Sequence, residues 1–276
     1  MQILEGKPVA EAVYAKLKLE LPNLPVVPKL VVLIVGEDSA SQTYVRSKTK
    51  KCADLGFLGE TIVFPGTVSQ DELNSQIDKL NSDPSVHGIL MQLPLPDSLS
   101  KPALLERLNP LKDVDGLHPE NAGKLAQGSP RFVPCTPAGI VEILRYYSIP
   151  MSGKKVVVIG RSEIVGKPVA QLMLLEDATV TVCHSKTSGL MQETRQADIL
   201  IVAAGRHSLV TKAHVKQGAT VIDVGIHRLD GRLEGDVVFE DVAQVAAGVT
   251  PVPGGVGPMT IAMLMRNVVL AARLQS

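Results

Sequence analysis

Residues 156–170 read VVVIGRSEIVGKPVA, and this stretch decides the fold of the chain. A β-branched run enters a glycine turn and an apolar-periodic segment leaves it, which is the opening of a βαβ unit. The N-terminus of the helix after such a turn can hold a phosphate group. The usual dinucleotide fingerprint is G-x-G-x-x-G, whereas here Ser162 stands at the second glycine and the last glycine comes later, at Gly166. The stretch indicates nucleotide binding, with an ordinary strand–helix turn as the alternative.

Length and composition allow one large or two ordinary domains with a substantial core, since the chain has 276 residues, 45% of them hydrophobic and 20% charged. Its 28 basic and 28 acidic residues give a net charge of zero, so we expect neither nucleic acid nor a membrane surface as a partner. The N-terminus has no signal-peptide pattern, and no uncharged run approaches the length of a membrane span.

The cysteines and histidines give no disulfide or metal signal. Cys52, Cys135 and Cys183 are odd in number and far apart, without a CxxC pair. The six histidines show no metal-ligand spacing. We therefore expect no metal site and a reducing, cytoplasmic setting.

Strands and helices alternate twice, before and after an irregular stretch at 109–131. The pattern predicts helices at 7–21, 39–55, 69–80, 101–108, 136–147 and 258–274, and strands at 29–36, 61–64, 86–93, 155–159, 179–183, 199–203, 220–224 and 236–239. This alternation predicts an α/β protein of two α/β lobes with a cleft between them, the second a Rossmann-type doubly wound parallel sheet. We expect the C-terminal helix to return to the first lobe.

The end of the second strand in the later lobe favours NADP over NAD. NAD sites usually place a carboxylate there to hold the ribose hydroxyls. Here residues 183–187 read CHSKT, which offers a hydroxyl and a lysine but no carboxylate. Together with Arg161 in the glycine turn, these groups suit the extra phosphate of NADP. Solvated loop charge is the alternative for Arg161 and Lys186.

The helix predicted at 39–55 carries a lysine on its apolar side. On a helical wheel Lys48 falls within a sector formed by Ala40, Tyr44, Val45, Cys52 and Leu55. One interpretation is a snorkelling side chain. The other is a desolvated amine that acts as a base, although moving a lysine pKa from about 10.4 to near 7 costs about 4–5 kcal/mol. Tyr44-x-x-x-Lys48 also matches the short-chain dehydrogenase pair, but here it precedes the glycine turn instead of following it.

Gln92 ends the strand predicted at 86–93, where open α/β sheets place ligand-binding groups. Asp113 and Asp115 lie in the irregular stretch, within the sequence KDVDG. A strand-end amide bound by loop backbone and an ordinary Asp-Gly turn are the alternatives for these positions.

Taken together, six blocks resemble the bifunctional methylenetetrahydrofolate dehydrogenase/methenyltetrahydrofolate cyclohydrolase family. They lie in family order over nearly the whole chain, and they are SQTYVRSK (41–48), GILMQLPLP (88–96), KDVDG (112–116), PCTP (134–137), GRSEIVGKP (160–168) and TPVPGGVGPMT (250–260). The resemblance implies that NADP takes a hydride from 5,10-methylenetetrahydrofolate, and that water opens the resulting 5,10-methenyl cation to 10-formyltetrahydrofolate. It also implies a homodimer, formed through the cofactor lobe.

The family pattern implies a role for each residue at a matching position. Lys48 would be the base or proton shuttle of the hydrolysis and Gln92 would orient it. Tyr44 would stack on the folate rings and Asp115 would hold the pterin edge. The implied folate contacts are Tyr44, Lys48, Gln92, Leu93, Asp115, Pro253, Gly254 and Gly255, and the implied cofactor contacts are Gly160, Arg161, Ser162, Gly166, His184, Ser185 and Ile226. The implied folate-binding catalytic domain covers 1–135 and is completed by 257–276, and the NADP-binding domain covers 136–256.

Other functions stay open at this point. A monofunctional two-lobe NADP dehydrogenase with a substrate lysine, such as a shikimate-type enzyme, would reduce NADP with shikimate instead of methylenetetrahydrofolate. A non-catalytic NADPH-binding regulator would bind NADPH without turnover on folates.

Overall fold

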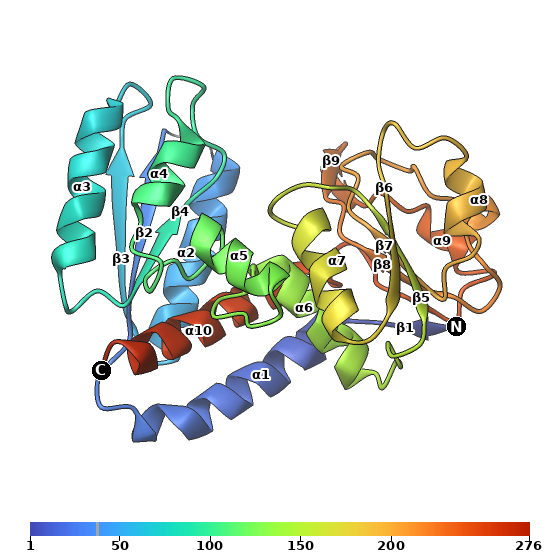
Figure 1. Cartoon of the computed structure of the whole chain (residues 1–276), viewed down its shortest axis with the longest axis horizontal. Coiled ribbons are helices and arrows are strands. Elements are labelled where there is room, and N and C mark those ends of the chain that lie inside the picture. Colours follow the sequence, from blue (N-terminus) through green and yellow to red (C-terminus); the bar gives the residue numbers. More distant parts are fainter. Residues whose placement is uncertain (37–38) are drawn as a thin grey trace. The chain divides into compact units, whose positions relative to one another are not determined.

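The computed structural model describes the backbone of residues 1–36 and 39–276, and the side chains of residues 1–36 and 45–276. This described chain forms two compact units (Figure 1). Residues 1–13 and 134–263 form the first, called the glycine-turn unit, and residues 14–133 and 264–276 form the second, called the Lys48 unit. Helices α1 (Gly6–Glu20) and α10 (Gly257–Leu274) contribute residues to both units.

A parallel sheet runs through the glycine-turn unit in the strand order β1-β11-β8-β7-β5-β6. Its strands are β1 (Gln2–Ile3), β5 (Lys155–Ile159), β6 (Thr179–Cys183), β7 (Ile199–Val202), β8 (Thr220–Asp223) and β11 (Gly248–Val249). Because β5 lies between β6 and β7, the chain adds strands first on one side of β5 and then on the other. The sheet is therefore doubly wound, as predicted, and its switch point lies at the carboxyl ends of β5 and β7, where such sheets bind ligands.

Helices cover both faces of this sheet, with α7 on one side of the strands and α8 and α9 on the other (Figure 1). They are α6 (Cys135–Tyr146), α7 (Gly166–Leu175), α8 (Leu190–Thr194), α9 (Phe239–Val242) and the 3-10 helix η2 (Lys212–His214). Val157 and Leu200 share a buried cluster with Val242 of α9. Val156 and Val158, which point to the opposite face of β5, are equally buried, as the continuous apolar run of this strand requires.

The Lys48 unit has its own parallel sheet, in the order β3-β2-β4. Its strands are β2 (Lys29–Val35), β3 (Leu58–Phe64) and β4 (Gly88–Met91), and its helices are α2 (Ser39–Asp54), α3 (Gln70–Ser82), α4 (Lys101–Arg107), α5 (Pro119–Ala126) and the 3-10 helix η1 (Leu21–Asn23). A parallel bridge between Ile89 and Asp113 adds a further segment beside β4. Leu33 of β2 shares a buried cluster with Leu73 of α3 and Leu104 of α4.

The C-terminal helix α10 returns to the Lys48 unit, as predicted. Its residues from Leu264 onward belong to this unit. The Cys52 thiol of α2 donates to Met265 Sδ at 3.7 Å, and Asn267 Nδ2 donates to Val114 O at 2.8 Å. Neither α10 nor any other helix in the described part of the chain is long and apolar enough to cross a membrane.

The strand predicted at 236–239 is wrong. Val237 forms an isolated bridge with Val210, and helix α9 begins shortly after it. The carboxylate of Asp223 accepts the amide N–H groups of Asp236 and Val237 at 3.1 and 3.0 Å. These amides therefore bind a side chain where a strand would need them for a neighbouring backbone.

The stretch predicted to be irregular at 109–131 contains α5. Pro119 stands at its first position, and His118 Nδ1 accepts the amide N–H of Glu120 at 3.0 Å, so the helix start is capped. The short strands missing from the prediction are β1, β11 and the hairpin of β9 (His227–Leu229) and β10 (Arg232–Glu234). Strands of two or three residues are too short to give a periodic signal.

Candidate functional site

Lys48 is buried on the inner side of α2. Its residue surface is 6% exposed, and Val45 and Cys52 beside it are buried as well. Arg46 and Lys50 of the same helix are exposed. The side of the helix that was predicted to be apolar is therefore the buried side in its described part, and the Lys48 amine is desolvated with it.

Gln92 receives the hydrogen bond of this amine. Lys48 Nζ donates to Gln92 Oε1 at 2.9 Å. The amide of Gln92 is itself oriented, because its Nε2 donates to Leu93 O at 2.7 Å. With the nitrogen bound to Leu93, the amide oxygen is the atom that faces Lys48. A neutral amide oxygen accepts a hydrogen bond from either protonation state of an amine, so this contact leaves Lys48 able to gain and lose a proton.

Asp115 reaches the same edge of the sheet as Gln92. Ile89 of β4 pairs in parallel with Asp113. Two residues beyond this bridge the chain arrives at Asp115, just as β4 arrives at Met91, the residue before Gln92. Asp115 is half-buried. The bridge therefore places the turn that carries Asp115 beside β4, the strand that leads into Gln92.

The rest of the KDVDG block is structural. Asp113 is buried, and its carboxylate accepts the amide N–H of His118 at 2.8 Å, which holds the turn before α5. Lys112 is also buried, and its Nζ donates to Leu80 O at 2.8 Å and to Asp83 O at 2.7 Å, the carbonyls at the end of α3. Burial lowers the pKa of the Lys112 amine, and the Asp83 charge partly opposes this change.

Tyr44 lies in α2 one turn before Lys48. Its side chain lies outside the described residues, as does that of Ala40, so its stacking role stays a prediction. Leu93 is half-buried next to Gln92, and the Leu93–Pro94 peptide is cis.

The glycine turn brings two strand ends into close contact. Gly160 has φ +123°, and a Cβ atom there would lie 2.2 Å from Ala203 O. Only glycine fits such a position. Ser162 Oγ accepts the amide N–H groups of Val165 and Gly166 at 3.2 and 3.3 Å, so it holds the turn that leads into α7. Because this oxygen serves as an acceptor twice, the hydroxyl proton is left to donate outward.

Arg161 and Ser185 follow β5 and β6, whose last residues pair directly. Their side chains are exposed at the same sheet edge. His184 shapes the loop after β6, because its Nδ1 accepts the amide N–H of Lys186 at 3.2 Å. The cations of Arg161 and Lys186 and the hydroxyl of Ser185 thus lie on adjacent loops, an arrangement that can bind a phosphate.

Two further loops lie at the edge of the sheet formed by the carboxyl ends of its strands. Ile226 follows β8 and is 63% exposed. Residues 253–255 follow β11, and the Val252–Pro253 peptide is cis. Gly254 O accepts the amide N–H of Gly6 at 2.8 Å, so this loop is bound to the start of α1.

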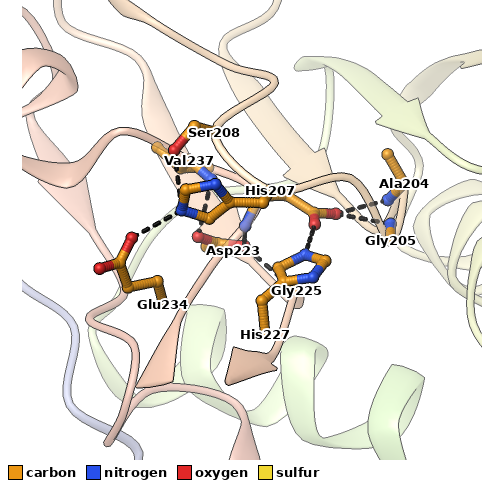
Figure 2. Close-up of polar contacts among 10 residues, drawn as sticks. Ala204, Gly205, His207, Ser208, Asp223, Gly225, His227, Glu234 and Val237 are labelled. Atoms are coloured by element: carbon orange, nitrogen blue, oxygen red, sulfur yellow. Dashed lines mark hydrogen bonds and ion pairs between the residues drawn. The ribbon is translucent and has the colours of Figure 1, made fainter. Parts of the chain in front are cut away.

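Two buried carboxylates, Asp223 and Asp236, lie beside this edge, and the sequence analysis missed both. Burial raises the pKa of Asp223 to about 6, the negative charge of Asp236 adds to the rise, and backbone hydrogen bonds oppose it. Figure 2 shows Asp223 with Gly225 and Val237, whose amide N–H groups its carboxylate accepts. An aspartate at a strand end, two residues before Gly225, is the sequence signal that could have pointed to this cluster. Within the described residues, no group of three or more His, Cys, Asp or Glu side chains is arranged to hold a metal ion.

Two family models match the chain. The tetrahydrofolate dehydrogenase/cyclohydrolase catalytic domain matches residues 4–115, and the tetrahydrofolate dehydrogenase/cyclohydrolase NAD(P)-binding domain matches residues 134–276. The first match contains Lys48, Gln92 and Asp115, and the second contains the glycine turn.

Relatives match over the full length as well. "Bifunctional protein FolD" of Halalkalibacterium halodurans is 52% identical over 274 residues, 98% of each chain. The crystal structure of the bifunctional enzyme FolD, a methylenetetrahydrofolate dehydrogenase/cyclohydrolase from Campylobacter jejuni, is 47% identical, covers 100% of both chains and has a TM-score of 0.97. The Trypanosoma brucei methylenetetrahydrofolate dehydrogenase-cyclohydrolase, complexed with NADP cofactor and inhibitor, is 40% identical, covers 99% of this chain and 97% of that one, and has a TM-score of 0.92. These matches confirm the resemblance found in the sequence, and the chain belongs to the tetrahydrofolate dehydrogenase/cyclohydrolase family.

Proposed function

We propose that the chain is a bifunctional enzyme of one-carbon folate metabolism. It oxidises 5,10-methylenetetrahydrofolate to the 5,10-methenyl cation with NADP, and it hydrolyses this cation to 10-formyltetrahydrofolate. Membership of the family supports both steps. The observation that carries the proposal is the desolvated Lys48 amine, held by Gln92 within the segment that the catalytic-domain model matches.

The oxidation needs no acid or base from the protein. A hydride leaves the methylene carbon of the folate, and the lone pair of the adjacent nitrogen stabilises the cation that remains. NADP, when bound, supplies the acceptor for this hydride. The protein contributes alignment of the two reactants. The glycine-turn unit accordingly offers backbone amides, hydroxyls and cations at its carboxyl edge.

The residues at this edge fit NADP. Gly160 allows the close backbone approach that a pyrophosphate needs, and Ser162 has a hydroxyl proton to donate. Arg161 and Ser185 fit the 2′-phosphate of NADP, and residues 184–187 contain no carboxylate that would repel it. Gly166, His184 and Ile226 complete the proposed cofactor contacts.

In the hydrolysis, Lys48 accepts a proton from water and donates a proton to the leaving nitrogen. Water adds to the methenyl carbon, and the neutral amine takes one water proton as the C–O bond forms. The ammonium then gives a proton to the ring nitrogen N5 as the C–N5 bond breaks, and the second water proton leaves to solvent. The positive charge of the substrate and the buried surroundings of Lys48 both disfavour the ammonium form before attack.

The remaining folate contacts rest on the family pattern. We assign the pterin edge to Asp115, ring stacking to Tyr44, and further contacts to Leu93, Pro253, Gly254 and Gly255. The proposed folate-binding catalytic domain covers 1–135 with 257–276, and the proposed NADP-binding domain covers 136–256.

One spectrophotometric assay tests the proposal. With methylenetetrahydrofolate and NADP, the wild-type enzyme should produce the methenyl form and then convert it to the formyl product. Lys48→Met should abolish the conversion of methenyl more completely than its formation, because only the second step needs a proton acceptor. Equal loss of both activities with unchanged folate affinity would contradict the proton role. NADPH binding without any turnover on folates would favour the regulator.

We propose a homodimer formed through the outer strand β6. Within the described chain, β6 ends the sheet order, and Val182 on it is exposed together with Leu174 and Leu175 of α7. Its sequence TVTVC contains no lysine, proline or other residue that usually protects a sheet edge. Sedimentation of the wild type as a dimer and of Val182→Lys as a monomer would support this interface, and a Val182→Lys dimer would contradict it.

We infer a cytoplasmic location from the thiols. Cys52, Cys135 and Cys183 are buried, and none of them forms a disulfide. Burial raises the pKa of Cys52 to about 11, so this thiol stays protonated and unreactive. Such a set of reduced thiols suits a reducing compartment, and cell fractionation tests the assignment.

A further inference from the structure

Asp236 is fully buried, and both oxygens of its carboxylate have hydrogen-bond partners. One oxygen, Oδ2, accepts the amide N–H groups of Ala204 and Gly205 at 2.7 and 2.8 Å. The other, Oδ1, lies 2.7 Å from His227 Nε2. The His227 tautomer with its proton on Nε2 donates to this oxygen. Donors on both oxygens compensate for the burial of this charge.

The groups that Asp236 joins come from two separate loops. Ala204 and Gly205 follow β7, whereas His227 lies beyond the end of β8. Figure 2 shows these residues converging on one point from different strands. The bond between His227 and Asp236 therefore ties the loop after β8 to the loop after β7.

Ile226 is held on both sides by this arrangement. The residue before it, Gly225, donates its amide N–H to Asp223 Oδ1 at 2.9 Å, and the residue after it is His227. The two backbone neighbours of an exposed isoleucine are thus each bound to a buried carboxylate. Gly225 leaves room for this, because a Cβ atom there would lie 2.4 Å from Asp236 Oδ1.

These loops lie where the reactive end of the cofactor is expected. Arg161 and Ser185, after β5 and β6, fit the 2′-phosphate at the adenosine end. A dinucleotide crosses a doubly wound sheet at the switch point, here between β5 and β7. Its nicotinamide end therefore points toward the loops after β7 and β8, which carry Ala204, Gly205 and Ile226.

We propose that Asp236 is a positioning residue for hydride transfer, acting through His227 to fix the loops after β7 and β8 around the nicotinamide. This inference rests on the proposed function. Asp236 takes no part in the chemistry, and it acts by keeping Ile226 and the Ala204–Gly205 backbone in one arrangement. A small displacement of such groups is enough to lower a hydride-transfer rate on the order of 100-fold.

His207 provides a matched control. Its ring stands edge-on to His227 with 5.7 Å between ring centroids, and its Nε2 contacts Glu234 Oε2 at 2.6 Å and Ser208 Oγ at 3.0 Å. None of these contacts involves Asp236. His207→Ala therefore removes a histidine from the same cluster and leaves the proposed tie between the loops intact.

The test compares His227→Ala, His227→Gln, His207→Ala and wild type in the dehydrogenase and cyclohydrolase reactions. His227→Ala should lower dehydrogenase kcat by about 10- to 100-fold. His227→Gln should recover most of this loss, because its side-chain amide can still donate to Asp236. His207→Ala should behave like wild type. The cyclohydrolase rate and the binding of 2′,5′-ADP, a probe of the adenosine end, should stay unchanged in every variant.

The outcomes separate this inference from the proposed function. A wild-type enzyme that reduces no NADP with methylenetetrahydrofolate overturns both. Wild-type activity in His227→Ala, an equal loss in His207→Ala, or a parallel loss of 2′,5′-ADP binding overturns the positioning role alone. Asp236→Asn adds a second check, because the double variant with His227→Ala should be no slower than the slower single variant if both act through one bond.

Discussion

Replacing Asp223 by asparagine should remove a pH dependence from the stability of the glycine-turn unit. Burial, helped by the charge of Asp236, raises the pKa of Asp223 from 3.8 to about 6 in the folded chain. Below both values the group is protonated in the folded and unfolded states. As pH rises, the unfolded chain loses the proton first, so this group favours unfolding increasingly until pH passes the folded value.

The magnitude follows from the size of the shift. A difference of roughly two pKa units corresponds to about 3 kcal/mol. Part of this free energy of unfolding has already been lost at about pH 5, and a further ~1.4 kcal/mol of it is lost between about pH 5 and pH 8. The asparagine keeps one oxygen for Gly225 and Asp236 but loses the bond from Val237, which lowers stability by an amount independent of pH.

Urea unfolding followed by circular dichroism across this pH range measures the effect. The transition of the glycine-turn unit is the one that added NADP shifts to higher urea. Stability of Asp223→Asn relative to wild type should rise by ~1.4 kcal/mol from about pH 5 to pH 8.

Asp198→Asn is the control for this experiment. A hydrogen bond from Lys216 and the backbone amide of Lys155 hold the pKa of Asp198 below its usual value. Asp198 is therefore ionised throughout this range in both states, and its variant should differ from wild type by a constant amount. Parallel stability curves for Asp223→Asn and wild type would refute the reasoning, because they would mean that Asp223 releases its proton as readily when folded as when unfolded.

Three further substitutions test the site. Gly160→Ala places a Cβ atom 2.2 Å from Ala203 O, so NADP reduction should be lost while cyclohydrolase turnover in the Lys48 unit survives. Arg161→Ala should raise KM for NADP about tenfold or more and leave KM for NAD unchanged, because the lost contact involves only the 2′-phosphate. Gln92→Glu should suppress cyclohydrolase turnover more than dehydrogenase turnover, because a carboxylate beside Lys48 holds the ammonium form. Steady-state assays of both reactions measure each outcome.

The parts of the fold that the sequence predicted are those with local patterns. The run from Val156 to Ile159 and the turn at Gly160 are contiguous, and they define β5 and the switch point. Lys48 belongs to one helix, so a helical wheel alone places it among buried neighbours. The match of six blocks in order added the partners that no wheel shows.

The Asp236 cluster could not be predicted in the same way. It joins Ala204 after β7, His227 at the start of β9 and Asp236 after β10, and only the fold makes them neighbours. In the sequence Asp236 follows a glycine and looks like an ordinary turn residue. The neighbouring carboxylate of Asp223 explains the incorrect strand at 236–239, since it accepts the amide N–H groups of Asp236 and Val237 that the strand would have used.

Two buried ionisable residues, Asp236 and Lys48, bind different kinds of hydrogen-bond partner. Asp236 accepts two backbone amides and lies against the imidazole of His227, and these contacts hold its carboxylate in one orientation. Lys48 meets an amide oxygen, which accepts from the charged and the neutral amine alike. A carboxylate in place of Gln92 would bind the ammonium more tightly and would keep the amine from accepting a proton from water. An uncharged partner such as Gln92 therefore suits the proton role proposed for Lys48.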